Sequence, residues 1–330
     1  MVRFPSLASL ALACCALVST QFSTHAAAQG YPAKPVRFIV STPAGTSPDI
    51  IARMASERLG KSMGQPFVVD NITGAGGILA TQTLVRGAPD GYTLMFAGMG
   101  AFVIDPYMKK DPGYQVEKDL VPIAFIYEQD RLSIAVHPDV PAKTLPELIS
   151  LAKQQPGKMS YGVTNVVLLV MVGQWLNKLS GTDMVQVTYK TAGQQMQDLL
   201  ANRIQWIVAA PPQLDSFVKA GKLRIVAVDG IGRYPKWPDV PSIAETFPGY
   251  RTSGMGILIG PRGIPASVTQ PLHAAMDKIN RDPEYQARLL EMSITVKDAG
   301  TPESLNGFVR ERRQYWANIF KTLNVQPGTE

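Results

Sequence analysis

The feature that most constrains the fold is an alternation of strand patterns and helical patterns, joined by short turns rich in glycine and proline. It begins with a nearly continuous apolar run from Val36 to Val40, which is typical of a strand covered on both faces. The small-residue turn 41–46 follows, and a helical pattern begins at Ser47. Ser47 is a good N-cap and Pro48 suits the first helical position, so we expect the helix to start there.

The same arrangement recurs about one βαβ unit later. The strand pattern from Phe67 to Val69 leads through Asn71 into the glycine-rich turn 74–77, and a helical run from Ile78 to Val85 follows. A helix start leaves backbone N–H groups unpaired at the positive end of the helix dipole, and both features bind anions. Two such starts facing one point would form a cradle for a carboxylate or phosphate without any charged side chain.

The alternation predicts an α/β fold of parallel, doubly wound sheets, whose ligands bind beyond the carboxyl ends of the strands. A third strand pattern, 92–97, ends in the segment 98–102, which we expect to be a flexible loop. Strand patterns at 121–127 and 132–136 indicate a crossing between two domains, and the strand pattern 254–259 leads back. Two crossing strands make a hinge, the geometry of a clamshell binding protein.

The domain organisation follows from these crossings. We expect a first, discontinuous domain of residues 29–130 and 252–330, and a second domain of residues 131–251. Further patterns predict helices at 145–153, 166–179, 194–202, 213–220, 265–280, 282–292 and 302–323, and strands at 159–162, 184–187, 204–208 and 223–228.

Residues 1–28 have the pattern of a cleaved signal peptide, with Arg3 at the start, an apolar core from Leu7 to Val18 and three alanines at 26–28. We therefore expect a soluble, exported protein. Both cysteines, Cys14 and Cys15, lie in this segment, so the mature chain would form no disulfide. Lipoprotein cleavage at one of them is an alternative, but the apolar core before it would be very short.

Composition and motifs argue against several functional classes. The formal charge of +6 comes from scattered basic residues that are not interleaved with aromatics, so we expect no nucleic-acid groove. Only His137 and His273 lie outside the signal, which gives no metal-ligand spacing. The sequence has no nucleophile elbow, no P-loop and no complete dinucleotide fingerprint. We expect a binding protein without a catalytic residue, metal or cofactor.

Several motifs then occur in an order that covers the expected mature chain. They are Tyr31 to Arg37, Pro43 to Gly45, Asp49 to Arg53, Asn71, Gly74 to Gly77, Ala88 to Leu94, Pro156 to Gly162, Val187 to Lys190, Ala220 to Arg224 and Pro238 to Ser242. In these motifs the chain resembles the Bug receptors of tripartite tricarboxylate transporters. The resemblance implies a periplasmic, two-domain solute-binding protein of the type II clamshell class. It also implies a small carboxylate as ligand and a membrane permease as partner, and we expect a monomer.

The resemblance also implies which residues grip the ligand. In that family the two loops described above hold one carboxylate, largely through backbone groups and bridging waters. By position, the ligand-binding residues here are Ala44, Gly45, Thr46, Ser47 and Asp49 in the first loop, with Gly74, Ala75, Gly76 and Gly77 in the second. We expect Asp49 to cap the helix and brace the loop, because its charge would repel an anion.

The second domain departs from the family pattern. The apolar run from Val163 to Val170 is interrupted only by Thr164 and Asn165, where the family usually has a polar segment, and Ala209 stands where an acid is common. Additional ligand carboxylates would stay unpaired there on closure, which argues against a citrate-like ligand. We expect an aromatic or apolar-bodied carboxylate. Its expected contacts are Met99, Phe102, Thr164, Asn165, Val166, Val167, Leu168 and Ala209.

Three alternatives stay open. Residues 166–170 could simply be the buried face of their helix, and Lys190 could be a polar contact or a surface residue. The binding protein could also present its carboxylate to a two-component sensor instead of a permease. An enzyme on the same scaffold is disfavoured, because it would need an acid–base pair or a nucleophile in the cleft.

Overall fold

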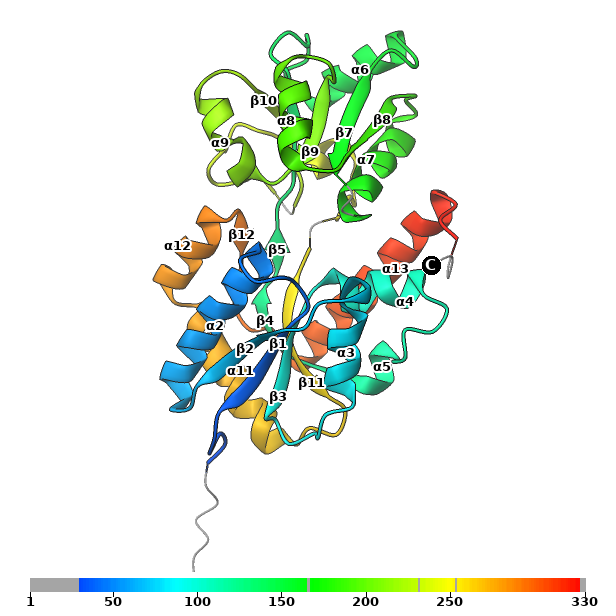
Figure 1. Ribbon diagram of the computed structural model, residues 1–330. Coiled ribbons are helices and arrows are strands. Elements are labelled where there is room, and N and C mark those ends of the chain that lie inside the picture. Colours follow the sequence, from blue (N-terminus) through cyan, green and yellow to red (C-terminus); the bar gives the residue numbers. More distant parts are fainter. Residues whose placement is uncertain (1–29, 165–166, 231, 253, 327–330) are drawn as a thin grey trace, which may run out of the picture.

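The computed structural model describes residues 30–164, 167–230, 232–252 and 254–326. The expected signal peptide, Asn165 and Val166 lie outside these ranges. The described chain forms two lobes, and each is built on a five-stranded sheet with helices on its faces (Figure 1). This confirms the predicted α/β clamshell class.

The first lobe contains the sheet β2-β1-β3-β11-β4. Its strands are β1 Val36–Val40, β2 Phe67–Asn71, β3 Thr93–Ala97, β4 Leu120–Tyr127 and β11 Gly256–Pro261. Its helices are α2 Ser47–Met63, α3 Ile78–Val85, α4 Asp105–Met108, α5 Val116–Asp119, α11 Ala266–Asn280, α12 Pro283–Glu291 and α13 Pro302–Thr322.

The second lobe contains the sheet β10-β6-β9-β7-β8. Its strands are β6 Ser133–Val136, β7 Ser160–Thr164, β8 Val185–Tyr189, β9 Trp206–Ala209 and β10 Arg224–Val228. Its helices are α6 Leu145–Gln154, α7 Val167–Ser180, α8 Ala192–Leu200, α9 Pro211–Lys219 and α10 Ile243–Thr246. The sequence patterns predicted neither α10 nor the short pair of β5 Gln129–Asp130 with β12 Ile294–Thr295.

The parallel arrangement predicted for the sheets holds for four of the five strands in each, and each sheet contains one reversed strand. Strand β11 runs antiparallel to β3 and β4, and β6 runs antiparallel to β9 and β10. Each reversed strand is the first one that the chain forms after crossing from the other lobe, so it starts at the edge that faces that lobe. The remaining strands of both sheets therefore direct their carboxyl ends toward the interlobe space, where ligands bind in sheets of this kind.

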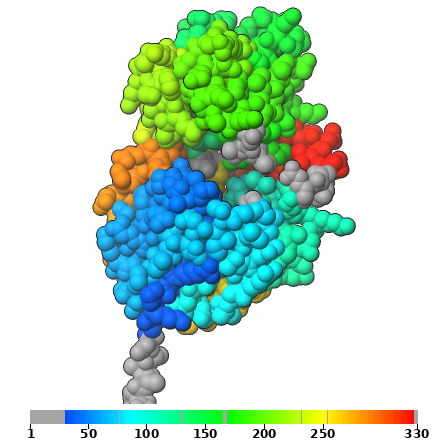
Figure 2. All heavy atoms as spheres, in the orientation of Figure 1, coloured from blue at the N-terminus to red at the C-terminus, as the bar shows by residue number. Residues whose placement is uncertain are grey.

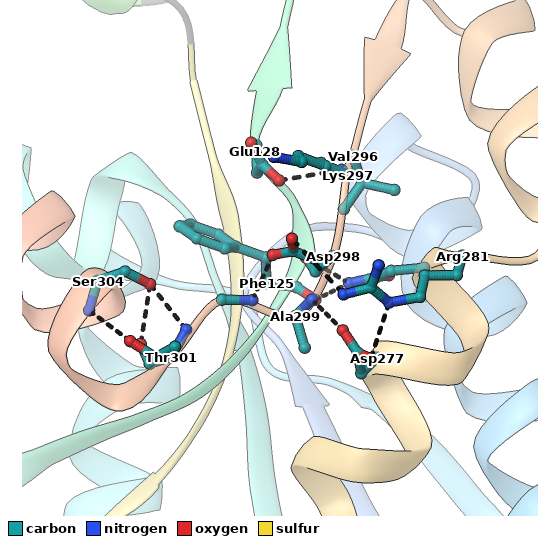
Figure 3. Close-up of polar contacts among 12 residues, drawn as sticks. Phe125, Glu128, Asp277, Arg281, Val296, Lys297, Asp298, Ala299, Thr301 and Ser304 are labelled. Carbon is teal, nitrogen blue, oxygen red and sulfur yellow. Dashed lines mark hydrogen bonds and ion pairs between the residues drawn. The ribbon is translucent and has the colours of Figure 1, made fainter.

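The first crossing is fixed to its lobe by the segment that leads into α13 (Figure 3). Phe125 donates its backbone N–H to the carbonyl of Ala299 at 2.9 Å, and Lys297 donates its backbone N–H to the Glu128 carboxylate at 2.9 Å. The second crossing is held by Thr252, whose hydroxyl donates to the buried Asp229 carboxylate at 2.6 Å. The domain boundaries at 130/131 and 251/252 stay a prediction.

Two local predictions also need correction. The segment after β3 is a π-helical turn, Gly100–Ile104, in which Phe102 is fully buried, and not a flexible loop. Its apolar side chains pack into the core, which fixes the backbone. The N-cap of α2 is Thr46 instead of Ser47, so Pro48 is the second residue of the helix and not the first.

Within the described ranges, no helix is long and apolar enough to cross a membrane. The same ranges hold no cluster of three or more His, Cys, Asp or Glu residues that could bind a metal ion.

Candidate functional site

The first loop joins β1 to α2 and ends at the helix start. Ala44 and Gly45 are exposed, and Gly45 has a φ of 81°, in the left-handed region that glycine adopts without strain. The backbone N–H of Gly45 donates to the Asp49 carboxylate at 2.9 Å, so that N–H group is occupied. Among the described residues, the backbone N–H groups of Ala44 and Ser47 have no hydrogen-bond partner.

The buried Asp49 ties this loop to the end of β2. Besides Gly45, its carboxylate accepts hydrogen bonds from Asn71 Nδ2 at 2.8 Å and from Arg53 Nε at 3.0 Å. Asn71 Nδ2 also donates to the carbonyl of Thr42 at 2.9 Å. The hydrogen bond from Arg53 lowers the pKa of Asp49 to about 2, so this carboxylate stays ionised. These contacts confirm that Asp49 braces the loop, although Thr46 is the N-cap.

An Asp49→Ala variant is expected to lose about 2 kcal/mol of unfolding free energy, because it leaves the Gly45 and Asn71 donors without their acceptor. It should also weaken carboxylate binding, since the loop loses the contact that sets its shape. Urea denaturation measures the first effect. Unchanged stability and unchanged ligand affinity would show that Asp49 does not hold the loop.

The second loop joins β2 to α3 and packs against the first. Its backbone has positive φ at Gly74 (134°), Ala75 (46°) and Gly77 (115°), and a short 3-10 turn, Ala75–Gly77, precedes α3. A methyl group at Gly77 would lie 3.2 Å from Cβ of Ser41, which follows β1. A larger side chain at this position would therefore push the two loops apart.

The two helix starts lie side by side at the carboxyl edge of the first sheet. Strands β1 and β2 are paired neighbours with Val40 opposite Asn71, and each runs into one of the loops. Ala75 is exposed in the second loop, and its backbone N–H has no partner among the described residues. Exposed and unpaired N–H groups at two adjacent helix starts can hold one anionic group. We call loop residues 42–49 and 73–77 the cradle.

The surface is hollowed between the two lobes (Figure 2). On the side of the second lobe, Thr164 is half-buried at the end of β7, and Ala209 is buried at the end of β9. Leu168 is half-buried in the first turn of α7 and packs against the hydrophobic core. Val167 begins this helix. The prediction that these residues contact ligand stays a prediction, as does the alternative that residues 166–170 form a buried helix face.

Two residues assigned to the ligand from the sequence lie in the core. Phe102 has no exposed surface, and Met99 retains only 7% of its surface. Both belong to a hydrophobic cluster that extends from the first lobe into the second. Their burial does not fit a direct ligand contact in this conformation, because the π-helical turn directs the apolar side chains inward.

Two exposed apolar residues beside the cradle were missed. Ile50 in the first turn of α2 is 43% exposed, and Leu79 in the first turn of α3 is 47% exposed. The Leu79 side chain lies over the second loop, since its Cδ1 is 2.6 Å from the position of a methyl group at Gly74. The helical periodicity of the sequence could have predicted this exposure. Each residue lies next to an isoleucine that faces the core, Ile51 or Ile78, and adjacent residues of a helix point in different directions.

The model of the tripartite tricarboxylate transporter family receptor, TctC, matches residues 51–325. The chain belongs to this receptor family. A UPF0065 protein of Bordetella bronchiseptica is 33% identical to this receptor over 308 residues, covering 92% of this chain and 89% of the relative. The family is one of solute-binding receptors and not of enzymes.

Solved structures of similar proteins agree with this assignment. The structure described as R. palustris Rpa4515 with adipate has a TM-score of 0.74 to this receptor and 25% sequence identity, and the match covers 90% of this chain and 99% of that one. The periplasmic binding protein BugD has a TM-score of 0.71 and 27% identity with the same coverage. The receptor is a periplasmic solute-binding protein of the TctC and Bug type.

Proposed function

We propose that this receptor captures a small carboxylate in the periplasm and delivers it to the membrane permease of a tripartite tricarboxylate-type transporter. The observation that carries the proposal is the cradle. At its two adjacent helix starts the exposed residues Ala44, Ser47 and Ala75 have backbone N–H groups without a partner among the described residues. Such groups favour an anion the size of a carboxylate. We further propose that residues 1–28 export the chain as a cleaved signal peptide and that the receptor acts as a monomer.

The ligand is proposed to carry an apolar or aromatic body. Ile50 and Leu79 offer exposed apolar surface next to the cradle, and burying it against a ligand would stabilise the complex. Ala209 supplies no charge at the end of β9. From the second lobe we expect Leu168 as an apolar neighbour of the ligand and Thr164 as a polar one. Adipate, which the similar R. palustris protein contains, has an apolar chain between its carboxylates.

Thermal-shift screening of the mature protein against adipate, benzoate, glutamate and citrate tests this proposal. A ligand at about a hundred times its Kd adds about 2.7 kcal/mol to the apparent unfolding free energy, which is a readily measured rise in Tm. We expect larger shifts with benzoate and adipate than with citrate. A strong shift with citrate and none with benzoate or adipate would contradict the apolar body while leaving carboxylate binding intact.

The Leu79→Ser variant sharpens the test. It should lose affinity for benzoate about tenfold, because it removes apolar surface that the ligand would cover. Val185→Ser is the matched control, since Val185 is similarly exposed (49%) on β8 of the other lobe. Equal affinities of the two variants would argue that Leu79 does not face the ligand.

A further inference from the structure

A buried carboxyl group lies behind the second loop of the cradle. Asp105 begins α4 and is only 6% exposed, and its Oδ2 has no hydrogen-bond partner in the part of the chain that the structure describes. A methyl group at Gly77 would lie 3.9 Å from this Oδ2 atom and 3.4 Å from Oγ of Ser41. Gly77 is the N-cap of α3, so the Asp105 carboxyl group faces one of the two helix starts that form the cradle.

The groups around Asp105 do little to stabilise the negative charge of its carboxylate against the cost of burial. Lys109, which directly follows the same short helix, is the cation that acts on it, but burial has the larger effect and raises the pKa of Asp105 to about 6. From the segment after α4, Tyr114 donates its hydroxyl to the carbonyl of Ala101 at 2.9 Å. From α3, Thr81 donates its hydroxyl to the carbonyl of Gly77 at 3.3 Å. Both hydroxyls are thus directed to carbonyls, and Ser41 is the neutral neighbour after β1.

A ligand carboxylate in the cradle would place a second negative charge near Asp105. Two carboxylates at one site oppose each other's ionisation, so the pair retains a proton to higher pH than either group alone. The ligand carboxylate is held by backbone N–H groups that favour its ionised form. No described residue donates a hydrogen bond to Oδ2 of Asp105, so the shared proton belongs on Asp105.

We propose that the receptor takes up one proton together with its carboxylate ligand and that Asp105 holds this proton in the complex. The inference rests on the proposed function and adds a linkage between pH and capture at the same site. Free receptor loses the proton as pH rises through the pKa of Asp105, and the complex keeps it to higher pH. Affinity is therefore expected to fall up to tenfold for each pH unit above this point.

Isothermal titration calorimetry at about pH 7 tests the linkage, with adipate and benzoate as probes. Each probe is titrated in imidazole and in Tris, which are cationic buffers that do not compete for the cradle and whose ionisation enthalpies differ. The difference in binding heat gives the number of protons taken up, which we expect to be close to one per bound probe. Asp105→Asn should bind the same probes with no net uptake. Asp111→Asn, which changes an exposed acid in the segment after α4, should keep the wild-type uptake.

The outcomes separate this inference from the proposed function. Binding of either probe without proton uptake would overturn the role of Asp105 and leave carboxylate capture standing. Proton uptake that persists in Asp105→Asn would also overturn it, by assigning the proton to another group. If neither these probes nor any acid of the thermal-shift screen binds, the proposed function fails, and the inference that rests on it fails as well.

Discussion

An Ala44→Asp variant is expected to bind adipate at least a hundredfold more weakly than the wild-type receptor. Ala44 is exposed in the first loop, and its backbone N–H is one of the donors proposed to hold the ligand carboxylate. Two like charges about 4 Å apart repel each other by about 4 kcal/mol at the effective dielectric constant near a protein surface. A hundredfold loss of affinity requires about 2.7 kcal/mol of this repulsion.

The matched control is Ala44→Asn, which has nearly the same shape as the aspartate variant but no charge. Its affinity for adipate should stay within about tenfold of wild type, and both variants should unfold within about 0.5 kcal/mol of wild type, since the site is exposed. Titration calorimetry and urea denaturation measure these quantities. Similar affinities for Asp and Asn at this position would show that no anion binds beside Ala44.

Asp105→Asn is expected to stabilise the free receptor by up to about 3 kcal/mol at about pH 7. Burial raises the pKa of this carboxyl group from 3.8 to about 6, so ionisation costs the folded state more than the unfolded state. The wild-type stability contributed by the protonated acid is full below about pH 4 and is lost as pH rises to about 6. Asparagine stays neutral throughout, so the variant avoids this loss.

The difference in unfolding free energy between Asp105→Asn and wild type should therefore be small at about pH 4. It should grow between about pH 4 and 6 and stay constant at higher pH. Urea denaturation across this range measures it without any ligand. Asp111→Asn changes an exposed acid and should show no comparable pH-dependent gain. A difference between Asp105→Asn and wild type that does not vary with pH would mean that the Asp105 carboxyl group titrates normally.

The sequence predicted most elements because their signals are local. The apolar run Val36–Val40 and the helix start around Pro48 each specify their own segment. Strand direction is different, because whether β6 or β11 runs with its neighbours depends on where the chain re-enters a lobe. The π-helical turn after β3 was missed for a similar reason, since packing of its side chains fixes that backbone.

The same distinction applies to the site. The cradle loops were predicted because small residues beside a helix start have a direct chemical meaning, and Asp49 was expected to brace them. Asp105 was not identified, because an acid followed by proline is typical of an ordinary helix start. Its burial against Gly77 arises only when the segments after β2 and β3 pack together. The exposed apolar surface of Ile50 and Leu79 was also identified only from the fold.

A crystal structure of the receptor with adipate shows whether the cradle holds the ligand carboxylate. We expect one carboxylate of adipate within hydrogen-bond distance of the backbone N–H groups of Ala44, Ser47 and Ala75, with the apolar chain near Leu79. No lysine or arginine side chain should contact that carboxylate. Adipate bound away from residues 42–49 and 73–77, or held there by a cationic side chain instead of the backbone, would contradict this expectation.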